Sequence, residues 1–265
     1  MMPRLFFDRD AAGQQHLTID GEQGHHFARV LRVRPGEQAA MVFNGSAYLA
    51  EVESVDSKAG TVAVRILQSL PPHEPAARVY LVQGLAKGDK VEDIVQRCTE
   101  VGVAGVLVCA TARSVVQLDE RKAAAKIDRW RRIAAEAASQ SQRDVIPSVD
   151  FAGTGSQVTQ WLERLQPDLL LLLDEDETAT GLKHALHNPG GRQAGLAGRP
   201  PVIAIAVGPE GGWDETERMR FRDEFQAVSV SLGPRILRTQ TAGQTALSAI
   251  LYEYGELGGE SGCRP

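Results

Sequence analysis

A short loop carries the residues best suited to chemistry. Residues 206 to 217 read AVGPEGGWDETE. Glycines let backbone N–H and C=O groups approach a ligand, and a helix N-terminus favours an anion, so many phosphate cradles share this layout. Phosphate is disfavoured here, because no Gly-Lys-Ser or Gly-Lys-Thr follows and Glu210 would place a negative charge where the phosphate should lie. Two interpretations stay open: a backbone grip on a neutral or cationic ligand, and a tight turn that binds nothing.

The loop must be positioned by the elements on either side of it. Residues 202–207 are apolar and β-branched enough to predict a buried parallel strand, and Asp214 and Glu217 have the spacing of a helix capping box. Two further predicted strands end in comparable loops, LLLDEDE and SLGPRILRTQTAG. Ligands gather beyond the carboxyl ends of parallel strands, so the three loops predict one shared site.

The chain divides into two patterns. Residues 1–72 read as short alternating strands, with a hairpin turn at Asn44-Gly45, and predict a small β-barrel. The segment before that hairpin, GHHFARVLRVRPG, fits either a short helix or a strand approach. A proline-rich linker, LPPHEP, marks a boundary near residue 72. Strands then alternate with helices over residues 73–255, which predicts an α/β domain with a mostly parallel sheet, and residues 256–265 predict a flexible tail.

Composition limits the possible functions. The net charge of −5 does not suggest a nucleic-acid protein, but residues 113 to 143 hold eight Lys or Arg against four Asp or Glu. A predicted helix at 119–141 carries six of these eight basic residues, and such a run is also typical of a solvated helix face. The absence of a signal peptide or a long apolar stretch predicts a cytoplasmic protein. Three widely spaced cysteines predict buried or free thiols and no metal. The sequence contains no Gly-x-Gly-x-x-Gly motif, which argues against an ordinary dinucleotide-binding fold.

Four motifs in a fixed order resemble a known family. They are RSVVQ at 113–117, RWRRIAAEAASQSQR at 129–143, VGPEGGWDETE at 207–217 and VSLGPRILRTQTA at 230–242. Together they resemble the 16S ribosomal RNA uridine-N3 methyltransferases of the SPOUT class, over nearly the whole chain. The resemblance implies a PUA-like N-terminal barrel and a SPOUT-type domain whose C-terminal part forms a deep trefoil knot, which periodicity alone would never propose.

The resemblance implies S-adenosylmethionine as the cofactor, held by backbone groups of the knotted loops. Its sulfonium is a cation, which suits a loop without a phosphate-binding lysine. The residues implied in cofactor binding are Leu172, Leu173, Val207, Gly208, Pro209, Glu210, Gly211, Gly212, Leu232, Gly233, Ile236 and Leu237.

The expected chemistry needs a positive charge near the base. Uracil N3 carries a proton at neutral pH, so the base becomes anionic when that proton leaves, and a guanidinium could stabilise the charge. Arg238 and Arg113 are the catalytic candidates, with contact to RNA phosphates as an equal alternative. No general base is assigned, since His25 and His26 belong to the first domain. Relatives commonly read Leu-Arg-Thr-Glu-Thr-Ala where this chain has Gln240, which argues against that carboxylate as an obligatory base.

Partners and alternatives follow from the same resemblance. The expected substrate is 16S rRNA within the small ribosomal subunit, and the expected assembly is a homodimer. A different RNA target and a non-catalytic RNA-binding protein remain as alternatives, although intact glycine loops argue against the second. The candidate RNA contacts are Arg4, Arg29, Arg32, Lys126, Arg129 and Arg143.

Overall fold

The structure is a computed structural model that describes residues 2–10, 13–116, 118–188 and 199–258. By contacts between residues the chain forms two units. The first unit comprises residues 1–74 and 138–145, and the second comprises 75–137 and 146–265. The predicted boundary near residue 72 stays a prediction, and the predicted tail lies outside the described residues from residue 259 onward. In the described ranges, no helix has the length and apolar character needed to cross a membrane.

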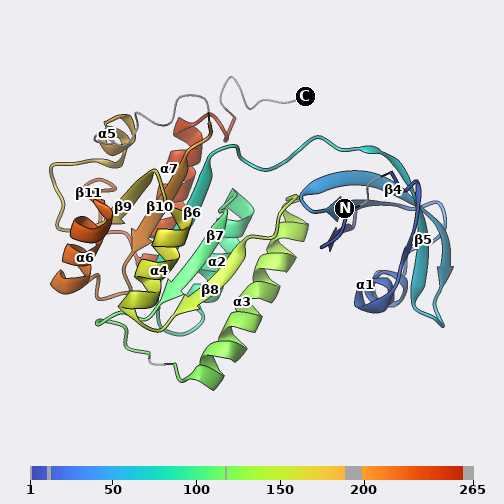
Figure 1. The fold of residues 1–265 in the computed structure, drawn as a ribbon, viewed down its shortest axis with the longest axis horizontal. Coiled ribbons are helices and arrows are strands. Elements are labelled where there is room, and N and C mark those ends of the chain that lie inside the picture. The colour runs from blue at the N-terminus through green and yellow to red at the C-terminus, as the bar shows by residue number, and fades with distance from the viewer. Residues whose placement is uncertain (1, 11–12, 117, 189–198, 259–265) are drawn as a thin grey trace. The chain divides into compact units, whose positions relative to one another are not determined.

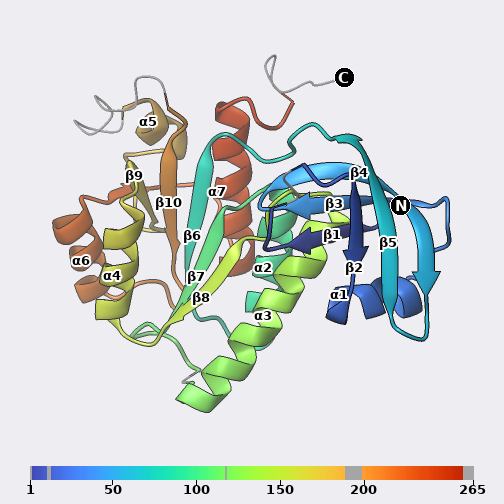
Figure 2. The same ribbon diagram turned by 45° about the vertical axis from the view of Figure 1, so that its right-hand side comes forward.

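A five-stranded, curled sheet forms the body of the first unit (Figure 2). Its order is β1-β3-β4-β5-β2. The strands are β1 (Arg4–Phe7), β2 (His16–Ile19), β3 (Gln38–Phe43), β4 (Ser46–Asp56) and β5 (Thr61–Ser69). Among the residues described for this unit, β1 and β2 form no ladder with each other, so the predicted barrel is observed as a curled sheet with two edge strands.

The predicted hairpin turn is confirmed. β3 and β4 pair antiparallel around Asn44 and Gly45, whose φ angles are 45° and 81°. Both residues thus occupy the left-handed region that a two-residue hairpin of the type I′ kind requires. The segment GHHFARVLRVRPG, for which the sequence allowed either a helix or a strand, is helical in its first part. Helix α1 (Gly21–His25) continues into a single π-helical turn, η1 (His26–Val30).

A group of hydrogen-bonded and ion-paired side chains around the buried Arg4, here called the Arg4 cluster, ties residues 138–145 into the first unit. It consists of Arg4, His73, Glu74, Arg143 and Asp144. Arg4 forms an ion pair with Asp144, and both side chains are 1% exposed. Arg143 Nη2 lies 2.5 Å from Glu74 Oε2. Glu74 Oε1 also accepts the Asp144 N–H at 2.8 Å, and the His73 N–H donates to Asp144 Oδ2 at 2.5 Å.

The second unit is built on a six-stranded, wholly parallel sheet (Figure 1). Its order is β11-β9-β10-β6-β7-β8. The strands are β6 (Arg78–Gly84), β7 (Gly105–Cys109), β8 (Ser148–Ala152), β9 (Leu169–Leu173), β10 (Val202–Val207) and β11 (Val228–Val230). The parallel sheet is as predicted, and β8 is an additional strand that the sequence pattern did not indicate.

Helices cover both faces of this sheet. They are α2 (Lys90–Val101), α3 (Glu120–Gln140), α4 (Gly155–Leu165), α5 (Leu182–His187), α6 (Glu215–Phe225) and α7 (Thr239–Glu253). One face packs against α2, α5, α7 and the buried side of α3, and the other against α4 and α6. Successive side chains of a strand point to opposite faces, which is why Leu171 belongs to the first core and Leu172 to the second.

Candidate functional site

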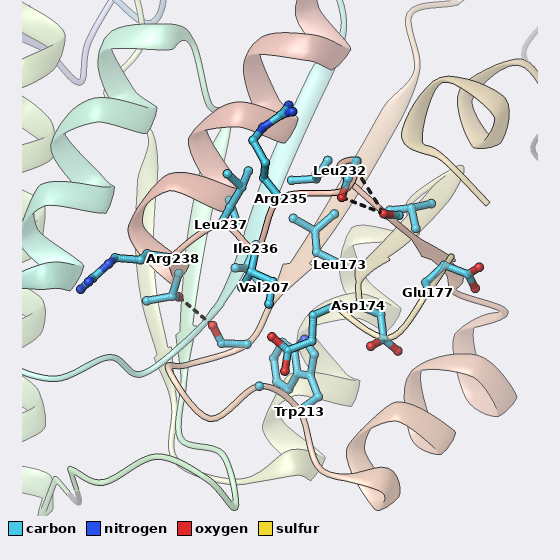
Figure 3. A pocket seen from close by; sticks show the side chains of 18 of the residues that line it. Leu173, Asp174, Glu177, Val207, Trp213, Leu232, Arg235, Ile236, Leu237 and Arg238 are labelled. Carbon is cyan, nitrogen blue, oxygen red and sulfur yellow. Dashed lines mark hydrogen bonds between the residues drawn. The ribbon is translucent and has the colours of Figure 1, made fainter. Parts of the chain in front are cut away.

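A pocket of about 800 Å³, here called the strand-end pocket, opens beyond the carboxyl ends of β9, β10 and β11. The loops that follow these strands supply most of its wall, together with the first residues of α7. Figure 3 shows Leu173, Val207, Leu232 and Leu237 grouped around an apolar interior. The three loops that the sequence assigned to one site therefore do meet in one place.

Glycine has a specific steric role at two positions of the loop after β10. A Cβ on Gly208 would lie 2.9 Å from backbone atoms of Gly212, so the loop can fold back on itself only with glycine there. Gly212 has φ +67°, and its N–H donates to the Pro209 carbonyl at 3.0 Å to close a turn. The glycines thus shape the loop itself, whatever it binds.

The turn leads directly into α6. The Asp214 side chain accepts the Glu217 N–H at 2.7 Å, and Glu217 Oε2 accepts the Asp214 N–H at 3.0 Å. This confirms the predicted capping box. Glu217 Oε1 also accepts the Ala112 N–H at 2.8 Å, so the same side chain fastens the loop after β7 to the start of α6.

Glu210 does not act as an isolated negative charge. Its Oε1 lies 2.6 Å from Lys90 Nζ and accepts the Lys87 N–H at 3.1 Å. Burial raises the pKa of Glu210, but the hydrogen bonds from Lys90 and Lys87 outweigh burial and leave the pKa below its ordinary value. Glu210 is therefore an ionised carboxylate whose charge is balanced by α2.

The acidic segment after β9 contains both paired and unpaired carboxylates. Asp174 lies 3.1 Å from Arg218 and 3.6 Å from Arg222, and its side chain is 6% exposed. Glu177 accepts N–H groups of its own turn, and the one from Thr180 contributes most to lowering its pKa. Glu175 also lines the pocket, and within the described part of the chain its side chain makes no hydrogen bond or ion pair.

A buried polar chain links two walls of the pocket. The Thr239 hydroxyl donates to the Gly208 carbonyl at 2.7 Å and accepts from Gln83 Nε2 at 2.8 Å. Gln83 is fully buried at the end of β6. The loop after β10 and the start of α7 are thereby fixed relative to each other, in addition to apolar packing.

Comparison with known families identifies this architecture. The model of the RNA methyltransferase domain matches residues 72–251, and that of the RNA methyltransferase PUA domain matches residues 19–64. The chain belongs to the RNA methyltransferase family.

Individual relatives agree along most of the chain. This RNA methyltransferase is 37% identical to ribosomal RNA small subunit methyltransferase E of Bacillus subtilis, over 92% of the chain and 93% of that protein. The structure of a Legionella pneumophila methyltransferase with bound SAM has a TM-score of 0.77 at 29% identity. The match covers 96% of this chain and 98% of the Legionella chain. The structure of ribosomal RNA small subunit methyltransferase E of Neisseria gonorrhoeae, bound to S-adenosyl methionine, has a TM-score of 0.74 at 26% identity. That match covers 96% of this chain and 98% of the Neisseria chain.

The implied cofactor-binding residues of this RNA methyltransferase lie together. All of them line the strand-end pocket except Leu172 and Gly211. Leu172 is buried in the core on the other face of the sheet. Gly211 instead faces Arg113, whose Nη1 donates to the Gly211 carbonyl at 2.8 Å.

The two arginines proposed for catalysis differ in position. Arg238 lines the pocket as the residue before α7, and within the described ranges its guanidinium has no hydrogen-bond or ion-pair partner. In Figure 3 its guanidinium extends away from the apolar side chains. Arg113 does not line the pocket and holds the loop that does.

The basic residues proposed for RNA contact also differ in burial and in whether their side chains already have partners. Arg4 and Arg143 are buried in the Arg4 cluster, where carboxylates occupy their guanidinium groups, so neither is presented to a phosphate. Arg29 donates to the carbonyls of Ser57 and Lys58. Arg32 is exposed, with φ 54° and no side-chain partner in the described part of the first unit.

The two candidates on α3 share one partner. Lys126 and Arg129 both reach Glu92, at 3.3 and 2.5 Å, and the Glu92 side chain is only 9% exposed. Part of the basic run therefore neutralises a carboxylate of α2 that packing has buried. Arg129 is still 55% exposed and keeps donors on its open side.

Sequence reasoning missed Lys90, Gln83, Thr239 and Glu175. Lys90 looked like an ordinary first-turn helix residue, and Gln83 was simply part of an apolar strand. The signal at Gln83 was its polarity, because an amide in a strand buried on both faces must be hydrogen-bonded. Glu175 could not have been told from its acidic neighbours, because only the coordinates show which carboxylates have partners.

Proposed function

We propose that this RNA methyltransferase transfers a methyl group from S-adenosylmethionine to N3 of a uridine in 16S rRNA of the small ribosomal subunit, and so acts in the cytoplasm. The observation that carries the proposal is the strand-end pocket, built from the loops in which the family resemblance is concentrated. Support comes from the relatives named ribosomal RNA small subunit methyltransferase E and from the two neighbours solved with the cofactor.

The pocket suits the proposed cofactor in size and chemistry. Its volume of about 800 Å³ lies within the usual range for small-molecule sites, and apolar side chains make up much of the interior. Leu173, Val207 and Leu237 would hold the adenosine part, beside the backbone groups of Gly208 and Gly233. When bound, the cofactor would supply an electrophilic methyl group.

The protein's own part in the reaction is to position the base and stabilise charge. The N3 proton of uracil would leave to water, so that negative charge would develop on N3 and the flanking carbonyl oxygens. N3 would then take the methyl group as the bond between that methyl group and the sulfur breaks, with S-adenosylhomocysteine as the leaving product. Arg238 lines the pocket, its guanidinium donors have no partner among the described residues, and it would stabilise that charge. Arg113 would act indirectly, because it holds the carbonyl of Gly211 in the loop after β10.

We also propose the two finer features of the class, the trefoil knot and the homodimer. The knot would involve the chain from β11 into α7, and an experimental structure traced through residues 228–251 tests it. The exposed Ile236 and Tyr252, at 82% and 68%, support pairing of two copies along α7. Light scattering should then give a particle of twice 28.6 kDa.

The proposed RNA contacts are phosphate contacts. Each lost phosphate contact lowers the slope of log affinity against log salt by about 0.7 to 0.9. Arg32→Ala should therefore flatten the salt dependence by about one, and Lys126→Ala with Arg129→Ala should flatten it further. Filter binding with small-subunit particles at several salt concentrations measures this. An unchanged slope for Lys126 and Arg129 would limit both to pairing with Glu92.

The decisive experiment is nucleoside mass mapping of rRNA. Small-subunit particles from cells lacking the protein are incubated with the pure enzyme and S-adenosylmethionine, and the digested rRNA is analysed for 3-methyluridine. Formation of one 3-methyluridine per particle is expected. A methyl group on a ribose hydroxyl, a methylated transfer RNA in place of rRNA, or no transfer at all would each contradict the proposal.

A further inference from the structure

The carboxylates that line the strand-end pocket differ in whether their charge is balanced. Asp174 is paired with Arg218 and Arg222, and Glu210 is paired with Lys90. The hydrogen bonds within its own turn occupy Glu177. Glu175 differs from these three, because no cation or donor in the described residues contacts its carboxylate.

Glu175 also faces the part of the pocket where the glycine loop leaves open space. Its Oε1 lies 3.7 Å from the point where a Cβ on Gly212 would stand. Arg113 Nη1 lies 4.0 Å from the same point, yet it donates to Gly211 and forms no ion pair with Glu175. A glycine at 212 therefore keeps free the space beside an uncompensated negative charge.

A second, independent feature of the same wall lacks a partner. The Trp213 side chain lines the pocket, the residue is 4% exposed, and its indole Nε1 has no hydrogen-bond partner in the described structure. Buried indole N–H groups normally find an acceptor. Figure 3 shows Trp213 and Asp174 in the lower part of the same view of the pocket. An unbalanced carboxylate and an indole N–H without a partner thus occur in the same wall of the pocket.

The opposite wall carries charge of the other sign. Arg235 and Arg238 are exposed, line the pocket, and have no side-chain partner among the residues described. The pocket thus has a negative end at Glu175 and a positive end on the loop before α7. A ligand with separated charges, cationic at one end and anionic or polar at the other, would complement both.

We propose that Glu175 is the anionic contact for the positive charge of the cofactor, an inference that rests on the proposed function. Glu210, the acidic residue of the glycine loop, is already balanced by Lys90. The charge available for the ligand is on the neighbouring loop. S-adenosylmethionine carries two positive groups, the sulfonium and the α-ammonium, and a carboxylate could meet either.

Calorimetry with three ligands tests the proposal. S-adenosylhomocysteine lacks the transferable methyl group and with it the sulfonium charge, and 5′-methylthioadenosine lacks both positive groups together with the carboxylate of the amino-acid part. Glu175→Gln keeps the size and an acceptor oxygen but removes the charge, so it should weaken S-adenosylmethionine binding about 10- to 100-fold. 5′-Methylthioadenosine should bind the variant within about threefold of the wild type.

The pattern among the ligands identifies the charge that is recognised. Unchanged S-adenosylhomocysteine binding assigns Glu175 to the sulfonium, and an equal loss assigns it to the ammonium. Glu163→Gln, on the exposed side of α4, is the matched control and should change nothing. Thermal unfolding without ligand verifies that both variants fold. As a measurement on the unaltered protein, high salt should weaken S-adenosylmethionine binding more than 5′-methylthioadenosine binding.

Two failures remain distinguishable. If Glu175→Gln binds all three ligands as the wild type does, or loses all three equally, the assignment of Glu175 is wrong while the proposed function stands. If the wild-type protein itself binds neither S-adenosylmethionine nor S-adenosylhomocysteine, the proposed function fails first.

Discussion

Arginine serves opposite purposes in the Arg4 cluster and at the strand-end pocket. In the cluster, Arg4 and Arg143 are buried and their guanidinium groups are held by carboxylates from other segments. At the pocket, Arg235 and Arg238 are exposed and make no ion pair or hydrogen bond within the described chain. The first pair holds the fold of a unit together, whereas the second leaves its donors available to a ligand.

The comparison shows why a count of basic residues cannot locate a binding surface. Motif and composition gave Arg143 the same weight as Arg129, but burial and partners separate them. A guanidinium that already has two carboxylate hydrogen bonds offers little to a phosphate. The substitutions below test this division, from the largest expected effect to the smallest.

Arg4→Ala should have the largest effect, and on stability alone. It leaves the buried Asp144 without its cation, which typically costs about 3 to 5 kcal/mol of unfolding free energy. Urea unfolding followed by circular dichroism measures the loss. Arg9→Ala, an exposed arginine over the Phe7 ring of the same unit, is the control and should cost about 1 kcal/mol or less. A loss below 1 kcal/mol for Arg4→Ala would contradict a structural role for the cluster.

Arg238→Ala should show the reverse pattern. Loss of a charge-stabilising donor should slow methyl transfer by about 100-fold or more, with affinity for S-adenosylmethionine within a few-fold and stability nearly unchanged. Single-turnover assays with saturating cofactor and small-subunit particles separate the chemical step from binding. Arg97→Ala, on α2 outside the pocket lining, removes an equal charge and should react normally.

Arg113→Ala separates catalysis from positioning. Because its guanidinium holds Gly211, the expected defect is weaker cofactor binding, by about fivefold, and not a slower chemical step. If Arg113→Ala abolished transfer while Arg238→Ala reacted at the wild-type rate, the two roles would have to be exchanged.

A smaller effect is expected where α7 meets α2. Gln240 Nε2 donates to Asp93 Oδ2 at 3.4 Å, so the glutamate common among relatives would here put two carboxylates in contact. Gln240→Glu should cost about 1 to 2 kcal/mol of stability near neutral pH, given partial solvent screening. Adding Asp93→Asn should recover most of the loss, because an amide donor then faces the new carboxylate. Thermal unfolding of both variants checks this, and a double variant no more stable than Gln240→Glu alone would show that the two side chains are not coupled.

The periodicity of apolar residues predicted much of the fold, and the spacing of turn and capping residues predicted where a hairpin turns and where a helix begins. The parallel sheet, the hairpin at Asn44-Gly45 and the capping box at Asp214 follow from local rules that need no knowledge of distant contacts. The sequence pattern did not predict β8, because its sequence SVDFA is short and only partly apolar. This segment forms a strand because it pairs with β7. The curled sheet and the PUA-domain match agree with the predicted β-rich first unit, whereas closure into a barrel depends on pairing between edge strands, which alternation along one strand cannot reveal.

The site was predictable in its location but not in its charges. Three strand-end loops pointed to one pocket, because parallel strands present their carboxyl ends together. Which carboxylates are balanced depends on Lys90, Arg218 and Arg222, and these residues lie far from them in the sequence. The glycines were assigned to ligand approach, whereas Gly208 is required by its own neighbours at 212 and 213.

The return of residues 138–145 to the first unit bears on how the protein could be dissected or recombined. A gene fragment that ends in the proline-rich linker would encode every strand of the curled sheet but not Asp144 and Arg143. Arg4 would then lose Asp144, its counter-charge, together with the segment that covers it, and the isolated piece should fold poorly unless the missing octapeptide is supplied. The first unit is therefore modular in space but discontinuous in the gene, so exchanging it between homologues requires cutting the coding sequence in two places.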